Sequence, residues 1–505
     1  LERLGLIVPD AINGTRDLQI FNFYGRGIDS PLEAFDQLAN PVARITGVLQ
    51  HLFTLSSFGV AYSSRTNPTR PQSSKPCHIQ AVICPESGAS PQARRMHVNE
   101  AVNRATSPVP ASLVDAVHQA LWGHFMHVEH QMFYDYWWDT PGFPWLPTAD
   151  QIAREFPNAA GWGTGMENCA LSAAQVLPGA LLRHELAPDE RTAHEARTLF
   201  GGLQRLFRVA RDPGFLPRGV ALDGVSHYPN SSADQYTMVF YALHAYSGSS
   251  ISTTADRQAI REIWQNILLR WKRDDWEDRR EDGAQAMFGD MNRIASDRAG
   301  RLLAALLGGF VVTGNQHWHD IYRQKLEEDD FARLRAGLPP EGAALYVYDQ
   351  NQVAWRLLWE LETDPEIRQR YRTLLHATAD AVQDRLLDYR QFEAAQHTHL
   401  LEACDWDWRQ ACTAPEEGSN QGAPYNARIR KLAPVIGYEH ELIQSPWEAA
   451  HILSLSEHAD HHRVLREHLP RLLDTFPWDR VALSWSIYNV EWTYWTTIQR
   501  ESTTI

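Results

Sequence analysis

Hydrophobic residues recur along most of the chain at the spacing of an amphipathic helix. Positions i, i+3, i+4 and i+7 are apolar in one segment after another, while the strict alternation of a half-buried strand is scarce. Some segments, such as SADQYTMVFYALHAY at 232–246, are apolar on nearly every side and predict buried helices. Others, such as DERTAHEARTLFGGLQRLFRVARD at 189–212, carry a charged face and predict outer helices. The pattern predicts an all-α protein.

Buried and outer segments tend to alternate along the chain. This alternation, repeated about six times, is typical of an (α/α)6 toroid of inner and outer helices, here with long loop insertions. A helical solenoid is the alternative, but the fixed repeat of about 33 to 47 residues that a solenoid shows is not visible. The expected helices lie near 31–60, 112–138, 165–183, 189–210, 232–247, 255–273, 295–313, 317–335, 345–361, 364–388, 438–455, 457–474 and 482–499.

Several of these helices are expected to begin at a capping box. In this motif a Ser or Thr side chain accepts a hydrogen bond from the amide three residues later, and a Glu or Gln side chain there reaches back. The boxes are Ser30–Glu33, Thr148–Gln151, Thr164–Glu167, Ser232–Gln235 and Ser445–Glu448.

Two loop-like stretches, 63–95 and 404–426, interrupt the helical pattern. We therefore expect residues 1–110 to form an N-terminal extension with one helix and a Ser/Pro-rich loop, and residues 111–505 to form the toroid. Each stretch holds a close cysteine pair, Cys77 with Cys84 and Cys404 with Cys412, whereas Cys169 stands alone. Two local disulfides would favour a periplasmic or secreted protein over a cytoplasmic one.

Composition excludes several classes of function. The 47 Lys and Arg against 62 Asp and Glu give a net charge of −15, which argues against a nucleic-acid partner. The longest apolar run, which begins at Leu302, is too short to span a bilayer, so we expect no membrane partner. No P-loop, GxGxxG, paired CxxC or GxSxG motif is present, and we expect no cofactor.

His124, His127 and His130 follow one another at steps of three in an expected helix. Each such step drifts about 60° around a helix, so the three rings would not meet at one ion. We therefore expect no metal site.

Polar loops stand directly before several of the apolar segments. The clearest is FLPRGVALDGVSHYPNSS at 215–232, and GWGTGMENC at 161–169 and LYVYDQNQ at 345–352 are similar. In a toroid the inner helices run parallel, so that the loops before them open into one funnel. The toroid then explains both features at once: the loop is polar because it lines the funnel, and the helix behind it is apolar because it is buried.

Two carboxylates in this funnel, Asp234 and Glu167, are the best candidates for acid and base catalysis. Each would lie in the first turn of an inner helix, where a capping or helix-dipole role is the alternative. Arg218, His227, Tyr228 and Asn230 form the densest polar cluster, and these four groups exceed what a turn requires. Trp162 would offer a face on which a sugar ring can stack, and Arg293 would add a second guanidinium.

The alternating helices, the loops GWGTGMENC and HYPNSSADQYT, and the closing YNVEWTYW at 488–495 resemble the six-hairpin glycosidase superfamily. Within it the glucuronyl hydrolases are nearest, and the similarity covers residues 110 to 500. Some relatives that act on unsaturated uronides carry a Trp-x-Arg-Gly-x-Gly-Trp stretch. Here Pro217-Arg218-Gly219 matches it without the flanking tryptophans, which argues against the unsaturated-substrate subclass.

The resemblance implies an exo-acting glycoside hydrolase that cleaves an oligo- or polysaccharide at a terminal glucuronyl residue. Asp234 and Glu167 would be its catalytic pair. Arg218, His227 and Arg293 would hold the carboxylate of the sugar, Trp162 and Tyr228 its ring, and Asn230 would bind substrate. Two alternatives remain: a polysaccharide lyase with Tyr228 or His227 as base, and a non-catalytic carbohydrate-binding scaffold. The oligomeric state is left open.

Overall fold

A computed structural model of the chain describes residues 111–137, 142–286, 289–291, 300–328, 343–394, 406–412 and 423–504. All of these belong to a unit that spans Pro108–Ile505. The described part is mostly helical, which confirms the all-α class. The predicted extension at 1–110, the helix near 31–60, Arg293, Cys77, Cys84 and Cys404 lie outside the described residues.

Six helices are buried over most of their length: α6 (Cys169–Leu186), α8 (Ala233–Gly248), α10 (Arg301–Thr313), α13 (Leu345–Leu361), α18 (Ser445–Leu455) and α20 (Val490–Thr504). Six others are α4 (Ala111–Ala120), α7 (Glu190–Val209), α9 (Thr254–Arg273), α11 (Gln316–Glu328), α14 (Pro365–Val382) and α19 (Ala459–Thr475). Shorter helices are α5 (Ala149–Ala153), α15 (Tyr389–Ala394), α16 (Ala423–Leu432) and α17 (Pro434–Glu439). Single 3-10 and π turns lie at Leu121–Phe125, Gln383–Asp388, Trp408–Ala411, His440–Gln444, Trp478–Arg480 and Ser484–Ser486.

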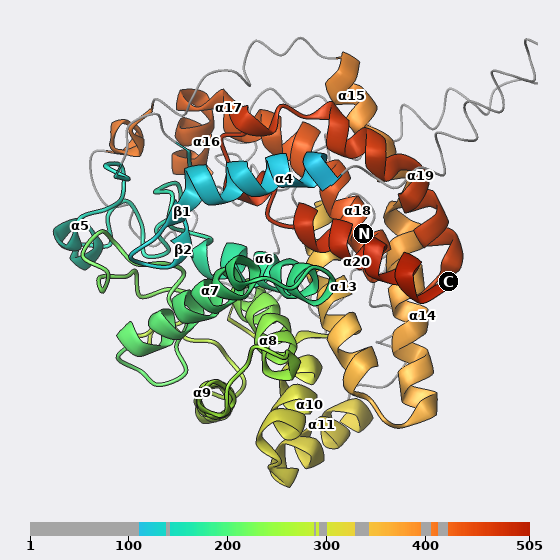
Figure 1. The fold of residues 1–505 in the computed structure, drawn as a ribbon. Helices are drawn as coiled ribbons and strands as arrows, with labels where there is room; N and C mark the ends of the chain where they lie inside the picture. The colour runs from blue at the N-terminus through green and yellow to red at the C-terminus, as the bar shows by residue number, and fades with distance from the viewer. Residues whose placement is uncertain are drawn as a thin grey trace, which may run out of the picture. The chain divides into compact units, whose positions relative to one another are not determined.

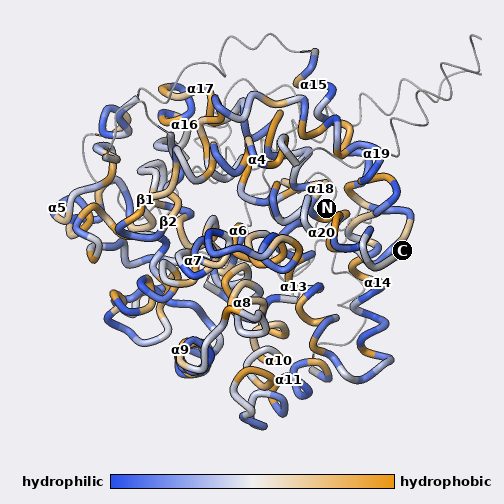
Figure 2. The backbone as a smooth tube through the Cα atoms, in the orientation of Figure 1, coloured by the Kyte–Doolittle hydropathy of each residue, from blue (hydrophilic) through white to orange (hydrophobic). Residues whose placement is uncertain are grey.

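The buried helices pack mainly on one another. Helix α6 contacts α8 and α20, α10 contacts α8 and α13, and α18 contacts α13 and α20. The second group covers them: α7 packs on α6, α11 on α10, α14 on α13 and α19 on α18. Figure 1 shows the pairs α10–α11 and α13–α14 side by side. Hydrophilic and hydrophobic stretches alternate along α14, as expected for a helix with one face on the core (Figure 2).

Close helix contacts explain one glycine pair in the core. A Cβ atom at Gly308 would lie 2.2 Å from the Trp264 ring, and one at Gly309 would lie 2.3 Å from Leu268. The indole of Trp264 also donates to the Ala305 carbonyl over 2.8 Å. The two glycines of α10 therefore admit the large side chains of α9. None of the described helices combines the length and the apolarity needed to cross a bilayer.

The helix predicted at 112–138 is much shorter than expected. Helix α4 gives way to a π turn, and an antiparallel hairpin follows, in which β1 (Met126–His127) pairs with β2 (Met132–Phe133). The hairpin turn lies against α7, where a Cβ atom on Gly202 would come within 2.0 Å of the Gln131 carbonyl oxygen. Helical periodicity in this segment therefore reflects burial against α7 rather than a continuous helix.

The predicted capping boxes have mixed outcomes. The box Thr148–Gln151 is confirmed, with both reciprocal hydrogen bonds at the start of α5. The box Thr164–Glu167 is wrong, because α6 begins later, at Cys169, and the Thr164 hydroxyl donates to the Gly161 carbonyl. The box Ser445–Glu448 is also wrong, because α18 continues directly from a π turn and has no side-chain cap. The box Ser30–Glu33 lies outside the described residues.

A buried ion cluster joins three helices. His118 of α4 lies 2.7 Å from the Glu491 carboxylate of α20 and 3.1 Å from that of Glu195 in α7. Burial alone would lower the pKa of His118, but the two carboxylates raise it to about 9. The imidazolium is therefore the form that the folded protein stabilises.

Replacing His118 with Gln should destabilise the protein in a pH-dependent way. A folded-state pKa of about 9 against 6.5 for the free side chain corresponds to about 3 kcal/mol. This stabilisation is fully present below pH 6.5 and is lost as the pH rises toward 9. Urea unfolding of wild type and variant should therefore converge at alkaline pH. His184→Gln, which removes a ring bonded to the neutral Thr192 hydroxyl, is the control for the loss of a histidine side chain outside this ion cluster.

Candidate functional site

Glu167 lies in the loop before α6, where its side chain organises the loop. Its Oε2 atom accepts hydrogen bonds from the backbone amides of Gly163 and Gly165, over 2.9 and 3.3 Å. The Tyr136 hydroxyl approaches Oε1 over 3.4 Å. Both glycines have positive φ, a conformation that a residue with a Cβ rarely adopts. The GWGTG sequence thus allows the backbone to fold around this carboxyl group.

A second buried carboxyl group, Asp135, lies directly beside Glu167. Its Oδ2 atom accepts hydrogen bonds from the backbone amides of Glu167 and Asn168, over 2.8 and 3.1 Å. The side chain of Asp135 is inaccessible to solvent, and its Oδ1 atom has no partner among the described residues. Sequence reasoning missed this residue, although a lone acid within the aromatic run FYDYWW is a visible signal.

The environment of Glu167 favours its protonated form. Burial raises the pKa of its carboxyl group to about 7, while the nearby Arg218 charge and the glycine amides limit the rise. Burial, reinforced by the negative charge of Glu167, also holds the pKa of Asp135 well above its usual range. When two carboxyl groups lie this close, the charge on one disfavours ionisation of the other.

Arg218 joins the loops that precede α6 and α8. Its Nε atom donates to the Glu167 carbonyl over 2.7 Å, and Nη1 donates to the Ser232 hydroxyl over 2.6 Å. The guanidinium lies 5.4 Å from the centre of the Trp162 ring, within cation–π range. Among the described residues, the remaining nitrogen, Nη2, has no hydrogen-bond partner. Next to Arg218, a Cβ on Gly219 would lie 2.7 Å from the Cys169 sulfur, so glycine permits this close approach.

The predicted capping box at Ser232 is wrong, because Ser232 bonds Arg218 of the preceding loop and Gln235 bonds the start of α6. Ser232 is the N-cap of α8 but makes no side-chain capping bond, because its hydroxyl accepts from Arg218. The Gln235 side chain accepts from the Leu171 amide over 3.0 Å and donates to the Asn168 side chain over 3.2 Å. These contacts fix the beginnings of α6 and α8 relative to each other.

Asp234, in the first turn of α8, has the opposite electrostatic environment to Glu167. Burial alone would raise the pKa of its carboxyl group, but the positive charges of Arg218 and Arg301 and the Ser232 hydroxyl lower it below the usual aspartate value. The residue is half-buried, whereas Glu167 is 5% exposed. Asp234 is therefore an ionised carboxylate that solvent reaches. Arg301, at the start of α10, was not expected at this site.

The other predicted site residues differ in the hydrogen bonds that their side chains make. The His227 ring lies 2.9 Å from the Val225 carbonyl oxygen and 3.1 Å from the Glu281 carboxylate. Tyr228 is buried, and its hydroxyl donates to the Phe156 carbonyl. Asn230 is 3% exposed, and its Oδ1 atom has no partner among the described residues. The structure thus brings Trp162, Glu167, Arg218 and Asp234 together, while His227 and Tyr228 make contacts that hold the loop.

Further acidic residues, not selected from the sequence, lie between the buried helices. Asp349 of α13 lies 2.6 Å from the His451 ring and accepts from the Gln175 side chain over 3.0 Å. Glu448 of α18 accepts from Gln444 over 2.6 Å, and burial, with the nearby Asp349 charge, raises its pKa well above the usual value. Asp349 lies in the polar stretch LYVYDQNQ, and Glu448 lies in a predicted capping box. For this reason neither was selected as a site residue from the sequence.

The histidines near 124–130 form contacts of their own. The rings of His127 and His130 stack with their centroids 3.8 Å apart, and His130 lies 2.7 Å from the Tyr134 hydroxyl. Burial lowers the pKa of His130 to about 4, so it is neutral near pH 7. Within the described ranges, no group of three or more His, Cys, Asp or Glu side chains is placed to hold a metal ion.

Comparison of the chain with models of protein families found no match, and comparisons with curated proteins and with solved structures likewise found none.

Proposed function

We propose that the protein is a glycoside hydrolase that uses Glu167 as general acid and Asp234 as the ionised carboxylate. One observation carries the proposal: the two carboxyl groups share Arg218 as a neighbour, yet their environments shift their pKa values in opposite directions. A pair of carboxyl groups held in different protonation states is what glycosidic cleavage requires.

In this proposal each residue has a defined chemical step. The Glu167 carboxyl group donates its proton to the leaving glycosidic oxygen as the bond to the anomeric carbon breaks. The Asp234 carboxylate stabilises the positive charge that develops at that carbon, or accepts a proton from the water that attacks it. The water supplies the new hydroxyl group, so atoms balance without a cofactor.

We also propose that the helices form an (α/α)6 toroid. The order of contacts among the buried helices supports it, since α6, α8, α10, α13, α18 and α20 each neighbour the next and α20 returns to α6. Glu167 and Asp234 then stand at one end of this ring, beside the first turns of α6 and α8. Such a position would suit a substrate that enters from the loop side.

A terminal uronate is the substrate end that the site would suit best. The Nη2 atom of Arg218 is available to a carboxylate, and guanidinium–carboxylate hydrogen bonds are among the strongest in proteins. The Trp162 ring, half-buried beside Arg218, would pack on the sugar. Asn230 is buried together with its Oδ1 atom, so it would shape the site from behind these residues. Arg293 remains a proposed contributor.

The lyase alternative has less support, because the contacts and burial of its two proposed bases do not favour the form that removes a proton. His227 pairs with Glu281, and the Tyr228 hydroxyl donates to a carbonyl oxygen. Burial also raises the pKa of Tyr228 well above its usual range, which disfavours the phenolate that would abstract a proton. A purely binding scaffold would have no need for carboxyl groups with opposite pKa shifts.

The decisive experiment is incubation with a panel of uronate-terminated and neutral oligosaccharides. Products are followed by mass spectrometry and by the ultraviolet absorbance of unsaturated uronides. We expect a gain of one water per cleavage and no new absorbance. New absorbance without a gain of water would identify a lyase, and binding without cleavage would identify a scaffold.

Replacing Arg218 with Lys should raise the KM for uronate-terminated substrates more than for neutral ones. Lysine keeps the charge but loses the guanidinium geometry, and a hydrogen bond to a charged group is worth about 1.5–3 kcal/mol, or roughly ten- to a hundredfold in affinity. Steady-state kinetics on matched substrate pairs measures the difference. Ser232→Ala, which removes one Arg218 partner but leaves the guanidinium, serves as the control. An equal rise for both substrates would contradict uronate recognition by Arg218.

A further inference from the structure

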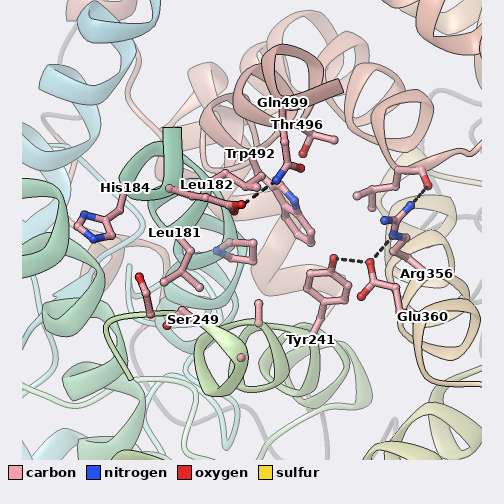
Figure 3. Close-up of a pocket in the computed structure, with 16 residues that line it drawn as sticks. Leu181, Leu182, His184, Tyr241, Ser249, Arg356, Glu360, Trp492, Thr496 and Gln499 are labelled. Carbon is pink, nitrogen blue, oxygen red and sulfur yellow. Dashed lines mark hydrogen bonds and ion pairs between the residues drawn. The ribbon is translucent and has the colours of Figure 1, made fainter. Parts of the chain in front are cut away.

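A cavity of about 440 Å³ lies among the later turns of the buried helices (Figure 3). This size falls within the roughly 300–1,000 Å³ range of small-molecule sites. Its lining comes from the C-terminal halves of α6, α8, α13 and α18 and from α20. Asp234, by contrast, lies in the first turn of α8, and Arg218 bonds Ser232, the N-cap of that helix. The cavity is therefore separate from the proposed catalytic site.

The cavity has an aromatic and apolar floor. The rings of Tyr241 and Trp492 lie 4.9 Å apart at an angle of 36°, and Trp492 also packs against His451 at 4.4 Å. Pro178 and Leu181 of α6 complete this side. Figure 3 shows Trp492 reaching down toward Tyr241, with Leu181 opposite. Such a surface suits the hydrocarbon part of a ligand and offers π faces to a cation.

The polar side carries more negative than positive charge. Its one Lys or Arg side chain, Arg356, is bonded to Glu360 over 2.5 Å and also to Glu457. Glu457 is in turn bonded to Arg500 over 2.6 Å, so these four charges compensate one another. Glu185, exposed at the rim and bonded to the neutral Gln499 side chain, adds a further negative charge.

Helix ends reinforce this negative potential. Helices α6, α8 and α18 end at Leu186, Gly248 and Leu455, and residues of each last turn line the cavity. The C-terminus of a helix carries about half a negative charge, and it favours cations nearby.

We propose that this cavity binds a small organic cation, a primary alkylammonium whose chain packs on Tyr241 and Trp492. The ammonium group lies at Glu185, whose charge no Lys or Arg of the described residues balances, and it donates to that carboxylate. An anion would meet three helix C-termini and the Glu185 carboxylate, while Arg356, the one Lys or Arg of the lining, is already paired with Glu360 and Glu457. A neutral molecule of the same shape would gain the apolar contacts but not the charge interactions.

The test is calorimetric titration of the full chain with n-butylamine, which is protonated at neutral pH. Butanol and butyrate, titrated in parallel, match its chain length with a neutral and an anionic head group. We expect saturable binding of butylamine, weakened by salt, with butanol and butyrate binding at least tenfold more weakly. Equal binding of butanol would mean a merely apolar cavity, and tighter binding of butyrate would mean that Arg356 dominates. Either result overturns the proposal, as does the absence of butylamine binding.

A blocking variant locates the binding site. A Cβ atom at Gly248 meets nothing within 4 Å, so Gly248→Phe places a ring at the cavity without a backbone clash, and it should abolish butylamine binding. Gly437→Phe, at an equally open helical position that does not line the cavity, is the matched control and should bind normally. Unchanged binding by Gly248→Phe would refute the location.

A charge variant provides a second, milder test. Glu185→Gln removes an exposed carboxylate and should weaken binding by a factor of about two to five, the effect of one exposed charge. Its side chain makes no contact that the core depends on, so the fold should be retained even if Gly248→Phe proves unstable. Undiminished butylamine binding by Glu185→Gln would contradict the electrostatic part of the proposal.

Discussion

Replacing Asp234 with Asn is expected to reduce turnover of a cleaved oligosaccharide by about 10²–10⁴, and to lower stability at neutral pH, because the lowered pKa of Asp234 means that its charge stabilises the fold. Asn keeps the shape of the side chain but removes the charge that Arg218 and Arg301 stabilise in the folded protein. A residue that merely complemented the helix dipole would give a different result, a loss of about 0.3–1 kcal/mol of stability with turnover intact. Kinetics and thermal unfolding of the same variant separate the two roles.

A first-turn acid elsewhere provides the control for Asp234. Asp256 lies in the first turn of α9, where it takes part in a capping box with Thr253. Asp256→Asn should lower stability and leave turnover unchanged. If Asp234→Asn kept full turnover and Tyr228→Phe lost it, the hydrolase proposal would give way to the lyase.

Replacing Glu167 with Gln should also reduce turnover by about 10²–10⁴, and it should remove one limb of the pH profile. A general acid acts while protonated, so wild-type kcat/KM should fall as the pH rises through about 7, the pKa of Glu167. The Asp234 limb should appear only in acid, below the usual aspartate range, because its pKa is lowered. The variant should keep the acid limb and lose the one near neutrality.

The stability of the Glu167→Gln protein should move in the opposite direction to its activity. A carboxyl group whose folded pKa is raised stabilises the fold in its protonated form, and this contribution is lost as the pH rises through about 7. The amide of Gln stays neutral, and its oxygen can still accept from Gly163 and Gly165. The variant should therefore resist urea better than wild type at pH 8.

Glu439 offers a matched control for Glu167. It is also a buried carboxyl group that accepts backbone amides, those of Ala482 and Leu483, and burial raises its pKa to about 8. It does not, however, take part in the Arg218 contacts. Glu439→Gln should leave the pH profile unchanged, and a profile altered equally by both variants would point to a general effect on the fold.

Helices with a regular apolar pattern were predictable from the sequence. Helices α7, α9 and α13 lie within one or two residues of the expected bounds, because their ends coincide with the ends of the hydrophobic periodicity. The segment 121–133 was not predictable in the same way. Its apolar spacing is compatible with a helix, and the packing of the hairpin on the Gly201–Gly202 surface of α7 decides otherwise.

Only part of the candidate site was predictable from the sequence, because capping motifs are ambiguous. Ser, Thr, Asp and Glu at a helix start have the same local signature whether they cap their own helix or bond a neighbouring one. Ser232 and Gln235 were assigned as a capping pair, yet they bind Arg218 and the α6 loop. Asp135 and Arg301 reach the site through tertiary packing. The run FYDYWW marks Asp135 as an unusual acid, but it does not encode that Asp135 lies beside Glu167.

The contact between α6 and α20 constrains the order in which the protein can assemble. A Cβ atom at Gly179 of α6 would lie 2.7 Å from the Trp492 backbone nitrogen of α20. His118 of α4 also bonds α20, at Glu491, 373 positions later. During synthesis, α6 leaves the ribosome some three hundred residues before the helix that covers it. Until α20 emerges, one apolar side of α6 stays uncovered, so a nascent chain halted before residue 490 should be a substrate for chaperones rather than a stable intermediate.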